Sequence, residues 1–164
     1  MKLKSLIISF ITLFVIWVLL NNNLTPEVLI SGGVVAFIVG LVFCYSCDIF
    51  NDLNLTPKAI LYWFIYIFVF LNELIKSNLD VARRVISPKL PINPGFVEVK
   101  TELKSKLGRM ILTNSITLTP GTFTVELTGD TIFIHWLDVK SGTVEEDTAA
   151  IVHKFEKYLK VIYG

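Results

Sequence analysis

The chain has 164 residues, 53% of them hydrophobic, a net charge of only +1 and a mean hydropathy of +0.65. This composition excludes an ordinary soluble domain and indicates a protein that is partly embedded in a membrane. Because the charge is nearly neutral and no basic patch interleaves with aromatic residues, we expect no nucleic-acid partner. The two cysteines are too few for a disulfide scaffold.

Charged residues are concentrated in the second half of the chain. Glu27 is the only charged residue between Ser5 and Cys47, and most of the others follow Glu73. The sequence therefore predicts two parts, with transmembrane helices within residues 1–86 and a soluble domain at residues 94–164.

Three apolar segments are candidates for crossing the bilayer, at about residues 5–20, 26–46 and 58–80. A helix needs roughly 17–25 mostly apolar residues to cross a hydrocarbon core of about 30 Å. The first segment is short by this measure, and the third is the strongest candidate. Lys2 and Lys4 before the first segment resemble a signal peptide, but no cleavage site follows, so we expect the segment to be retained.

The second segment has a face of small residues and ends in two cysteines. Gly32, Gly33 and Gly40 predict a surface for close helix packing, which we assign to contact with another chain. Cys44 and Cys47 form a CxxC motif that occurs in redox pairs and metal sites. Because a second such pair is missing from the sequence, we interpret them as small apolar residues of the helix.

The third segment begins with aromatic residues and ends before two prolines. Tyr62, Trp63 and Tyr66 are typical of the aromatic belt at a membrane interface. Pro88 and Pro91 stop the helical pattern.

With three crossings, one side of the membrane carries four Lys and Arg near the helix ends and the other carries three. This slight excess favours a cytoplasmic C-terminal part. The residues on that side are Lys76, Arg83, Arg84 and Lys89.

Glu73 is the one acid near the interior of a predicted membrane helix. A charged group at depth often marks an ion pathway, and Asp80 lies two turns further along. The alternative is that Glu73 lies at the helix end and pairs with Lys76, while Asp80 is solvated.

The periodicity after residue 94 predicts a small α+β domain. The expected order is a strand at 96–100, a helix at 102–112, strands at 122–128 and 131–137, and a helix at 143–162. Two helices would then cover one side of a small sheet. The last strand is the more apolar of the hairpin and so the more central. Because the domain is too small to bury a large core, we expect it to pack against a partner or the third helix.

A catalytic constellation is not predicted. Ser115, His135 and Asp138 have the residue types of a triad, but His135 and Asp138 are three apart and point to opposite faces of a strand. No nucleophile elbow surrounds Ser115. The sequence also lacks a phosphate loop, a dinucleotide fingerprint and a metal-ligand cluster, so we expect no cofactor and no metal.

The runs SITLTPGTFTVEL and GDTIFIHWLD, with ELIKSNLDVARRVISPKLPINPGFVEVKTELK upstream, resemble the E subunit of Mrp-type multisubunit Na+/H+ antiporters. The family pattern has an acid that ends the last membrane helix, then N-x-D-V, S-P-K and P-G motifs before the first strand. The resemblance covers residues 60–140, and the first 55 residues share only hydropathy and an Asn-rich turn. The matching positions are Glu73, Asn78, Asp80, Val81, Ser87, Pro88, Lys89, Pro94 and Gly95.

The resemblance implies a membrane anchor with a cytoplasmic C-terminal domain, in a cell-membrane complex that exchanges Na+ for H+. Its partners would be the lipid bilayer and the other membrane subunits of the antiporter module. Related modules occur in archaeal membrane-bound hydrogenases and sulfur-reducing complexes, where hydrogenase-like iron–sulfur subunits are further partners.

In that family the main proton channels lie in other subunits, so our first hypothesis is an accessory subunit that stabilises assembly. The alternative is a subunit that lines a Na+ path through Glu73, helped by Asp80. A membrane-anchored enzyme that acts alone is a third hypothesis, which the residue inventory disfavours.

The most distinctive motif of the soluble part is a threonine-rich turn. Pro120 presets φ and Gly121 accepts the positive φ that a type II turn requires. Thr117, Thr119 and Thr122 have hydroxyls that can bond free backbone groups around it. The motif either joins the first soluble helix to the hairpin or forms a docking surface for a neighbouring subunit.

Overall fold

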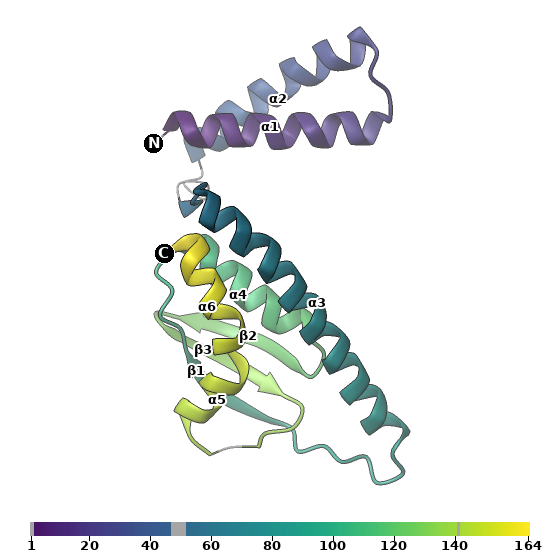
Figure 1. Cartoon of the computed structure of the whole chain (residues 1–164), viewed down its shortest axis with the longest axis vertical. Coiled ribbons are helices and arrows are strands. Elements are labelled where there is room, and N and C mark those ends of the chain that lie inside the picture. Colours follow the sequence, from purple (N-terminus) through teal and green to yellow (C-terminus); the bar gives the residue numbers. More distant parts are fainter. Residues whose placement is uncertain (1, 47–51, 141) are drawn as a thin grey trace. The chain divides into compact units, whose positions relative to one another are not determined.

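The computed structural model describes residues 2–46, 52–140 and 142–164. The chain folds into two compact units, Met1–Leu53 and Asn54–Gly164 (Figure 1). The first unit is a helical hairpin, and the second contains a long helix, a three-stranded sheet and three shorter helices. This confirms the predicted class, a helical apolar N-terminal part followed by a small α+β part.

The first unit is built from α1 (Lys2–Asn21) and α2 (Pro26–Ser46), which pack against each other. Small side chains line the contact and let the two backbones approach closely, as is common between membrane helices. The buried small residues are Ser5 and Ser9 on α1 and Gly32, Ala36 and Gly40 on α2.

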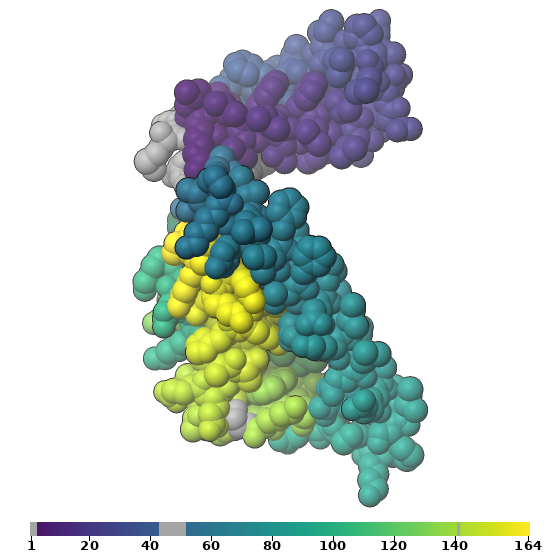
Figure 2. Space-filling view, in the orientation of Figure 1, coloured from purple at the N-terminus to yellow at the C-terminus, as the bar shows by residue number. Residues whose placement is uncertain are grey.

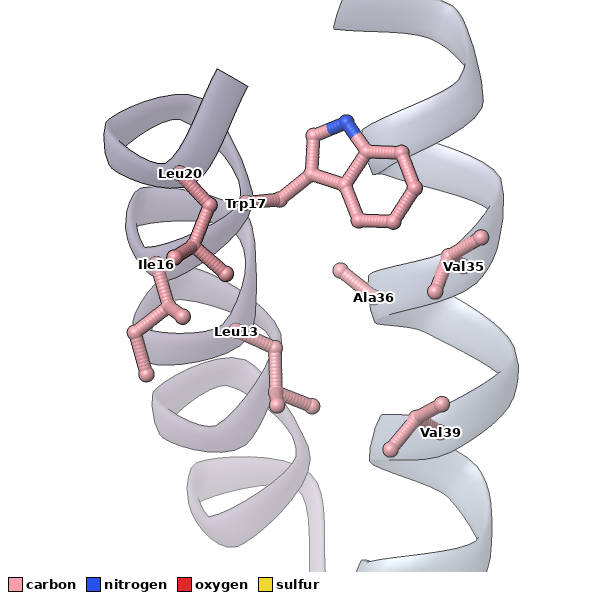
Figure 3. Close-up of a pocket in the computed structure, with 7 residues that line it drawn as sticks. All are labelled: Leu13, Ile16, Trp17, Leu20, Val35, Ala36 and Val39. Carbon is pink, nitrogen blue, oxygen red and sulfur yellow. The ribbon is translucent and has the colours of Figure 1, made fainter. Parts of the chain in front are cut away.

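Trp17 fixes the packing near the turn that joins the two helices. Its indole lies over Gly32, where an added Cβ would be only 2.3 Å from Trp17 Cδ1. Its Nε1 donates to the carbonyl of Val28 at 3.1 Å. Figure 3 shows the indole extending from α1 toward α2 beside a small apolar pocket. The pocket is lined by Leu13, Ile16, Trp17, Leu20, Val35, Ala36 and Val39.

The glycine face of α2, which we expected to contact another chain, packs against α1 of the same chain through two of its three glycines. Gly32 packs on Trp17, and Gly40 packs on Leu6 and the backbone of Phe10. An added Cβ at Gly33 would meet no atom within 4 Å. The side chains of Cys44 and Cys47 lie outside the residues that the structure describes.

The long helix α3 (Pro57–Ile86) has well-defined ends. Thr56 caps its first turn by accepting from the backbone N–H of Ala59, and Pro57 occupies the first helical position. It ends at Ile86 because Pro88 cannot continue it. By length and composition, Leu3–Asn21 of α1 and all of α3 could cross a membrane, whereas the described apolar part of α2, Pro26–Val42, is shorter.

The sheet consists of β1 (Gly95–Lys100), β2 (Thr122–Thr128) and β3 (Thr131–Trp136) in the order β1-β3-β2. All neighbours are antiparallel, and β3 is central, as its apolar composition predicts. The register between β2 and β3 shifts between Thr124 and Glu126, which marks a β-bulge.

Three short helices cover one face of the sheet (Figure 1): α4 (Lys106–Leu118), α5 (Val144–Ile151) and α6 (His153–Tyr163). Two details differ from the sequence prediction. The helix expected at 102–112 instead runs from Lys106 to Leu118: Ser105 accepts from the N–H of Gly108 and caps its start, and its end lies six residues later than predicted. The helix expected at 143–162 is capped by Thr143 as predicted, but divides into α5 and α6 at Val152.

The core lies between the sheet and these helices, whereas the opposite face of the sheet is open. On the open face Phe96 packs edge-on against His135, with ring centroids 5.2 Å apart. Phe96 is 74% exposed and Phe123, from the other edge strand, is 56% exposed. The largest fully buried side chains of the core are Phe155, Leu103, Leu112, Ile116, Ile132, Ile134, Leu159 and Ile162.

The hairpin contact generates a test with a matched control. We predict that Gly32→Ala lowers the stability of the α1–α2 hairpin by roughly 1–3 kcal/mol, because the new methyl group overpacks against Trp17. Gly33→Ala, one residue away in open space, is the control and should not lower stability. Thermal unfolding of the full chain in mild detergent, followed by circular dichroism, measures both. Equal effects of the two substitutions would contradict the predicted packing.

Candidate functional site

Helix α3 packs along the C-terminal domain through an aromatic face. Figure 2 shows α3 beside α6. In Figure 1, α4 lies behind these two helices. Trp63 packs edge-on against Tyr163, with centroids 6.2 Å apart, and Tyr66 packs on Phe155 at 6.3 Å. The predicted support from the third helix is therefore present.

Tyr66 joins three helices at the centre of this contact. Its side chain is buried, its ring lies against α6, and its hydroxyl shares a hydrogen bond with the Ser115 hydroxyl on α4. Ser115 in turn donates to the carbonyl of Ile111 at 2.7 Å. The hydrogen bond matters because a buried hydroxyl without a partner is unfavourable by about 1–3 kcal/mol.

A polar pocket of about 270 Å³ lies further along α3, where the threonine-rich turn meets the helix. It brings together both sets of residues singled out by the sequence, the two acids and the turn. Its lining residues are Glu73, Lys76, Ser77, Asp80, Thr119, Pro120, Thr122, Trp136, Lys140, Ala150, Ile151 and Lys154.

Glu73 is held between two lysines. Its carboxylate pairs with Lys76 one turn along α3 and with Lys154 of α6, each at 3.3 Å. The pair with Lys76 is the one that the alternative interpretation of the sequence predicted. The pair with Lys154 was not predicted, because α6 is distant in sequence. The Glu73 side chain is only 21% exposed, and its pair with Lys154 helps to fix α3 on α6.

Asp80 is also paired, and it is more exposed. Arg84 donates to its carboxylate at 2.7 Å and also pairs with Asp138, beyond β3, at 2.9 Å. A third contact runs from Arg84 Nη1 to the carbonyl of Pro91 at 2.6 Å. Arg84 therefore ties the end of α3 to the segment before β1 and to the segment after β3, a role that the sequence did not reveal.

The turn motif uses its hydroxyls inside the chain. Thr119 donates to the carbonyl of Ser115 at 2.6 Å, and Thr122 donates to the carbonyl of Ile116 at 2.7 Å. The Thr117 hydroxyl accepts from the backbone N–H of Thr124 at 3.2 Å. These bonds satisfy backbone groups at the end of α4 and the start of β2, which is the architectural role that the sequence suggested.

Gly121 has the conformation expected for the turn. Its φ is +95°, and the N–H of Thr122 bonds the carbonyl of Thr119 at 3.3 Å. A Cβ at this position would lie 3.8 Å from both Leu137 and Val81 of α3. The turn thus presents backbone to α3 at close range.

The charge of the pocket wall is unfavourable for a cation. Lys76, Lys140 and Lys154 outnumber Glu73 and Asp80 among its lining residues. Among the residues described by the structure, no group of three or more His, Cys, Asp and Glu could hold a metal ion.

The triad residue types are dispersed over the domain. Ser115 is buried and bonded to Tyr66, His135 packs on Phe96 at the open face of the sheet, and Asp138 pairs with Arg84. Each of these side chains thus has a partner unrelated to nucleophilic catalysis.

Sequence reasoning assigned Tyr62, Trp63 and Tyr66 to a membrane interface and missed their protein partners. The sequence does contain a pattern that indicates protein packing, because one face of the helix repeats at intervals of three and four residues. This face consists of Tyr66, Phe70, Glu73 and Ser77. That face carries rings followed by polar groups, which suits packing on a protein domain.

Comparison with known proteins gives a consistent result over nearly the whole chain. The sequence model of a family described as Na+/H+ ion antiporter subunit matches residues 10–162. The chain is 36% identical to Na(+)/H(+) antiporter subunit E1 of Staphylococcus haemolyticus, covering 96% of each chain. It is 32% identical to subunit E1 of Staphylococcus aureus, again covering 96% of each chain.

A solved structure is similar as well. A chain of the membrane-bound sulfane sulfur reductase, an archaeal respiratory membrane complex, shares 46% identity and superposes with a TM-score of 0.85. The match covers 98% of this chain and 99% of that one. Together with the curated relatives and the predicted motifs, it shows that this chain belongs to the E subunit family of Mrp-type Na+/H+ antiporters.

Proposed function

We propose that this chain is an accessory subunit that stabilises the assembly of a cation/proton antiporter module. The observation that carries this proposal is the pairing of both candidate ion-path acids. Glu73 is held by Lys76 and Lys154, and Asp80 is held by Arg84. Because the Glu73 carboxylate pairs with two lysines where α3 contacts α6, its main role in this proposal is to stabilise that contact.

The open face of the sheet supports an assembly role. Phe96 and Phe123 are large, exposed side chains, and Val125 beside the bulge is 53% exposed. Phe96 and Phe123 lie on either side of His135, with which both pair in the sheet, and an exposed apolar face of this kind is typical of a contact surface. We assign the docking of a neighbouring subunit to this face, because the hydroxyls of the turn at Thr117–Thr122 are already bonded within the chain.

The proposed host is a redox-driven membrane complex with a built-in antiporter module. In its support, the identity to the chain of the archaeal sulfane sulfur reductase is 46%, against 36% for the staphylococcal antiporter subunit. Iron–sulfur subunits would then be partners of the complex, and a stand-alone antiporter is the alternative host.

A second candidate function is a direct part in Na+ passage. It rests on the pocket wall, where the carboxylates of Glu73 and Asp80 lie with the Thr119 and Thr122 side chains. Oxygen ligands of this kind suit a hard cation. The three lysines on the same wall weigh against it.

The accessory role predicts that damage to the turn prevents assembly. We expect Gly121→Val to abolish incorporation of the chain into its complex, because a β-branched residue is strained at a φ of +95° and would press on Val81 of α3. Gly142→Val, where an added Cβ meets no atom within 4 Å, is the control and should assemble normally. Mild-detergent extraction of native membranes followed by mass spectrometry measures assembly.

The same extraction distinguishes the hosts. Antiporter-like membrane subunits alone would indicate a stand-alone exchanger, and additional iron–sulfur subunits would indicate the redox-driven complex. An intact complex containing Gly121→Val but without ion exchange would contradict the accessory role. So would normal assembly and exchange in a strain that lacks this chain.

The pairing of Glu73 predicts that its charge is dispensable for transport. We expect Glu73→Gln to lower the stability of the α3–α6 contact by less than about 1 kcal/mol, as for other partly exposed pairs, and to leave Na+ transport per assembled complex unchanged. Lys154→Gln, which removes the other partner, should give the same result. Reduced transport only in the assembled Glu73→Gln complex would instead support the ion-path function.

A further inference from the structure

Helix α3 has two faces with different surroundings. One face packs on the C-terminal domain, and the other is apolar and exposed along most of the helix. The exposed side chains recur at helical intervals and include Phe64 at 60% and Phe68 at 70%. The others are Ile60, Leu61, Ile67, Leu71, Ile75 and Leu79, which are between 43% and 65% exposed.

The contact with the domain extends along almost the whole of α3. It begins with Tyr62, whose ring lies 6.4 Å from that of Tyr158 on α6, and reaches Arg84, which pairs with Asp138. At 1.5 Å per residue this stretch is roughly 33 Å long, more than the thickness of a hydrocarbon core of about 30 Å. If α3 crossed a bilayer in this structure, the domain packed against it would have to lie within the hydrocarbon.

The surface of the domain does not suit a hydrocarbon environment. Helix α6, which packs on α3, exposes Lys157, and its Lys160 bonds the Glu102 carboxylate, which is 78% exposed. The hydrogen bond from Lys160 holds the pKa of the Glu102 carboxyl below its usual range, so this pair is charged at neutral pH. Charged groups and irregular backbone facing lipid are unfavourable by several kcal/mol each.

We propose that α3 does not cross the membrane but lies along its surface, with the exposed apolar face in contact with the lipid bilayer. The partner of this face is the lipid, at the boundary of headgroups and acyl chains, where amphipathic helices bind. The opposite face carries the domain, which remains in water. Lys58 and Arg83 on α3 are exposed, and their long side chains can reach the headgroups.

The distribution of positive charge supports this topology independently. All 15 Lys and Arg residues lie either before Ser5 or from Lys58 onward. If only α1 and α2 cross, all of them are on one side of the membrane, and the turn between the two helices has none. Three crossings would place Lys2, Lys4 and Lys58 on the opposite side from the other positive residues. The positive-inside rule favours the two-crossing topology, with the α1–α2 turn outside.

The position of α3 in the chain also favours lipid as its partner. Only residues 47–56 separate α2 from α3. Even when fully extended, such a segment spans at most about 36 Å. The start of α3 is therefore tethered within this length of the end of a membrane helix.

Cysteine labelling tests the topology in the intact complex. In a Cys44→Ser, Cys47→Ser background, Lys58→Cys and Lys89→Cys place one thiol just inside the start of α3 and one beyond its end. A membrane-impermeant maleimide is applied to right-side-out and to inside-out native vesicles. We expect both thiols to react in the same vesicle orientation, and Leu24→Cys in the α1–α2 turn to react in the other. Reaction of Lys58→Cys and Lys89→Cys in different orientations would overturn the proposal.

Spin labels at two further positions test the partner. A label at Phe68→Cys should collide several-fold more often with oxygen, which concentrates in lipid, than with a water-soluble nickel complex. The control, Asn114→Cys on the exposed side of α4, should show the opposite preference. If the label at Phe68→Cys meets neither agent, a protein partner covers this face and the lipid assignment is wrong. If Lys58→Cys and Lys89→Cys both react only from outside, α3 still lies along the surface, but the cytoplasmic placement of the domain fails.

Discussion

The packing of Tyr66 between α4 and α6 is the contact on which the C-terminal unit depends. Its ring lies on Phe155, which is itself fully buried, and its hydroxyl is bonded to Ser115 beside the threonine-rich turn. The domain has a sheet with helices on one side only, so it can bury few side chains by its own elements. Helix α3 supplies the missing layer, and the helix and the domain form one unit.

This arrangement also explains the charges around the pocket. Once the aromatic residues bring α3 onto α6, Glu73 comes within reach of Lys154, and Arg84 comes within reach of Asp138. These pairs are partly exposed, so they contribute little to net stability, and their main effect is to fix how α3 docks on the domain. Glu73 and Asp80, the two acids of the family resemblance, are thus both paired with basic side chains in this chain.

Much of the fold follows from the sequence, because local chemistry decides it. The type II turn at Pro120 and Gly121, the cap at Thr143 and the central position of β3 depend on neighbouring residues or on strand hydrophobicity. The partners of α3 could not be predicted, because a face of Tyr, Trp and Phe suits either a membrane interface or a protein core. The bulge in β2 and the break at Val152 depend on packing between distant segments, which periodicity does not report.

If α3 is stabilised by the domain rather than by a surrounding bilayer, α3 and α6 should open together, and amide hydrogen exchange in the membrane-embedded complex measures this. Phe155→Ala removes the ring that contacts both Tyr66 and Phe70, and α1 serves as the internal reference. We expect amides of α3 and α6 to exchange faster together in this variant, while those of α1 stay protected. Unchanged protection of α3 beside a loosened α6 is the behaviour of an independent membrane-spanning helix and would show that the domain does not stabilise α3.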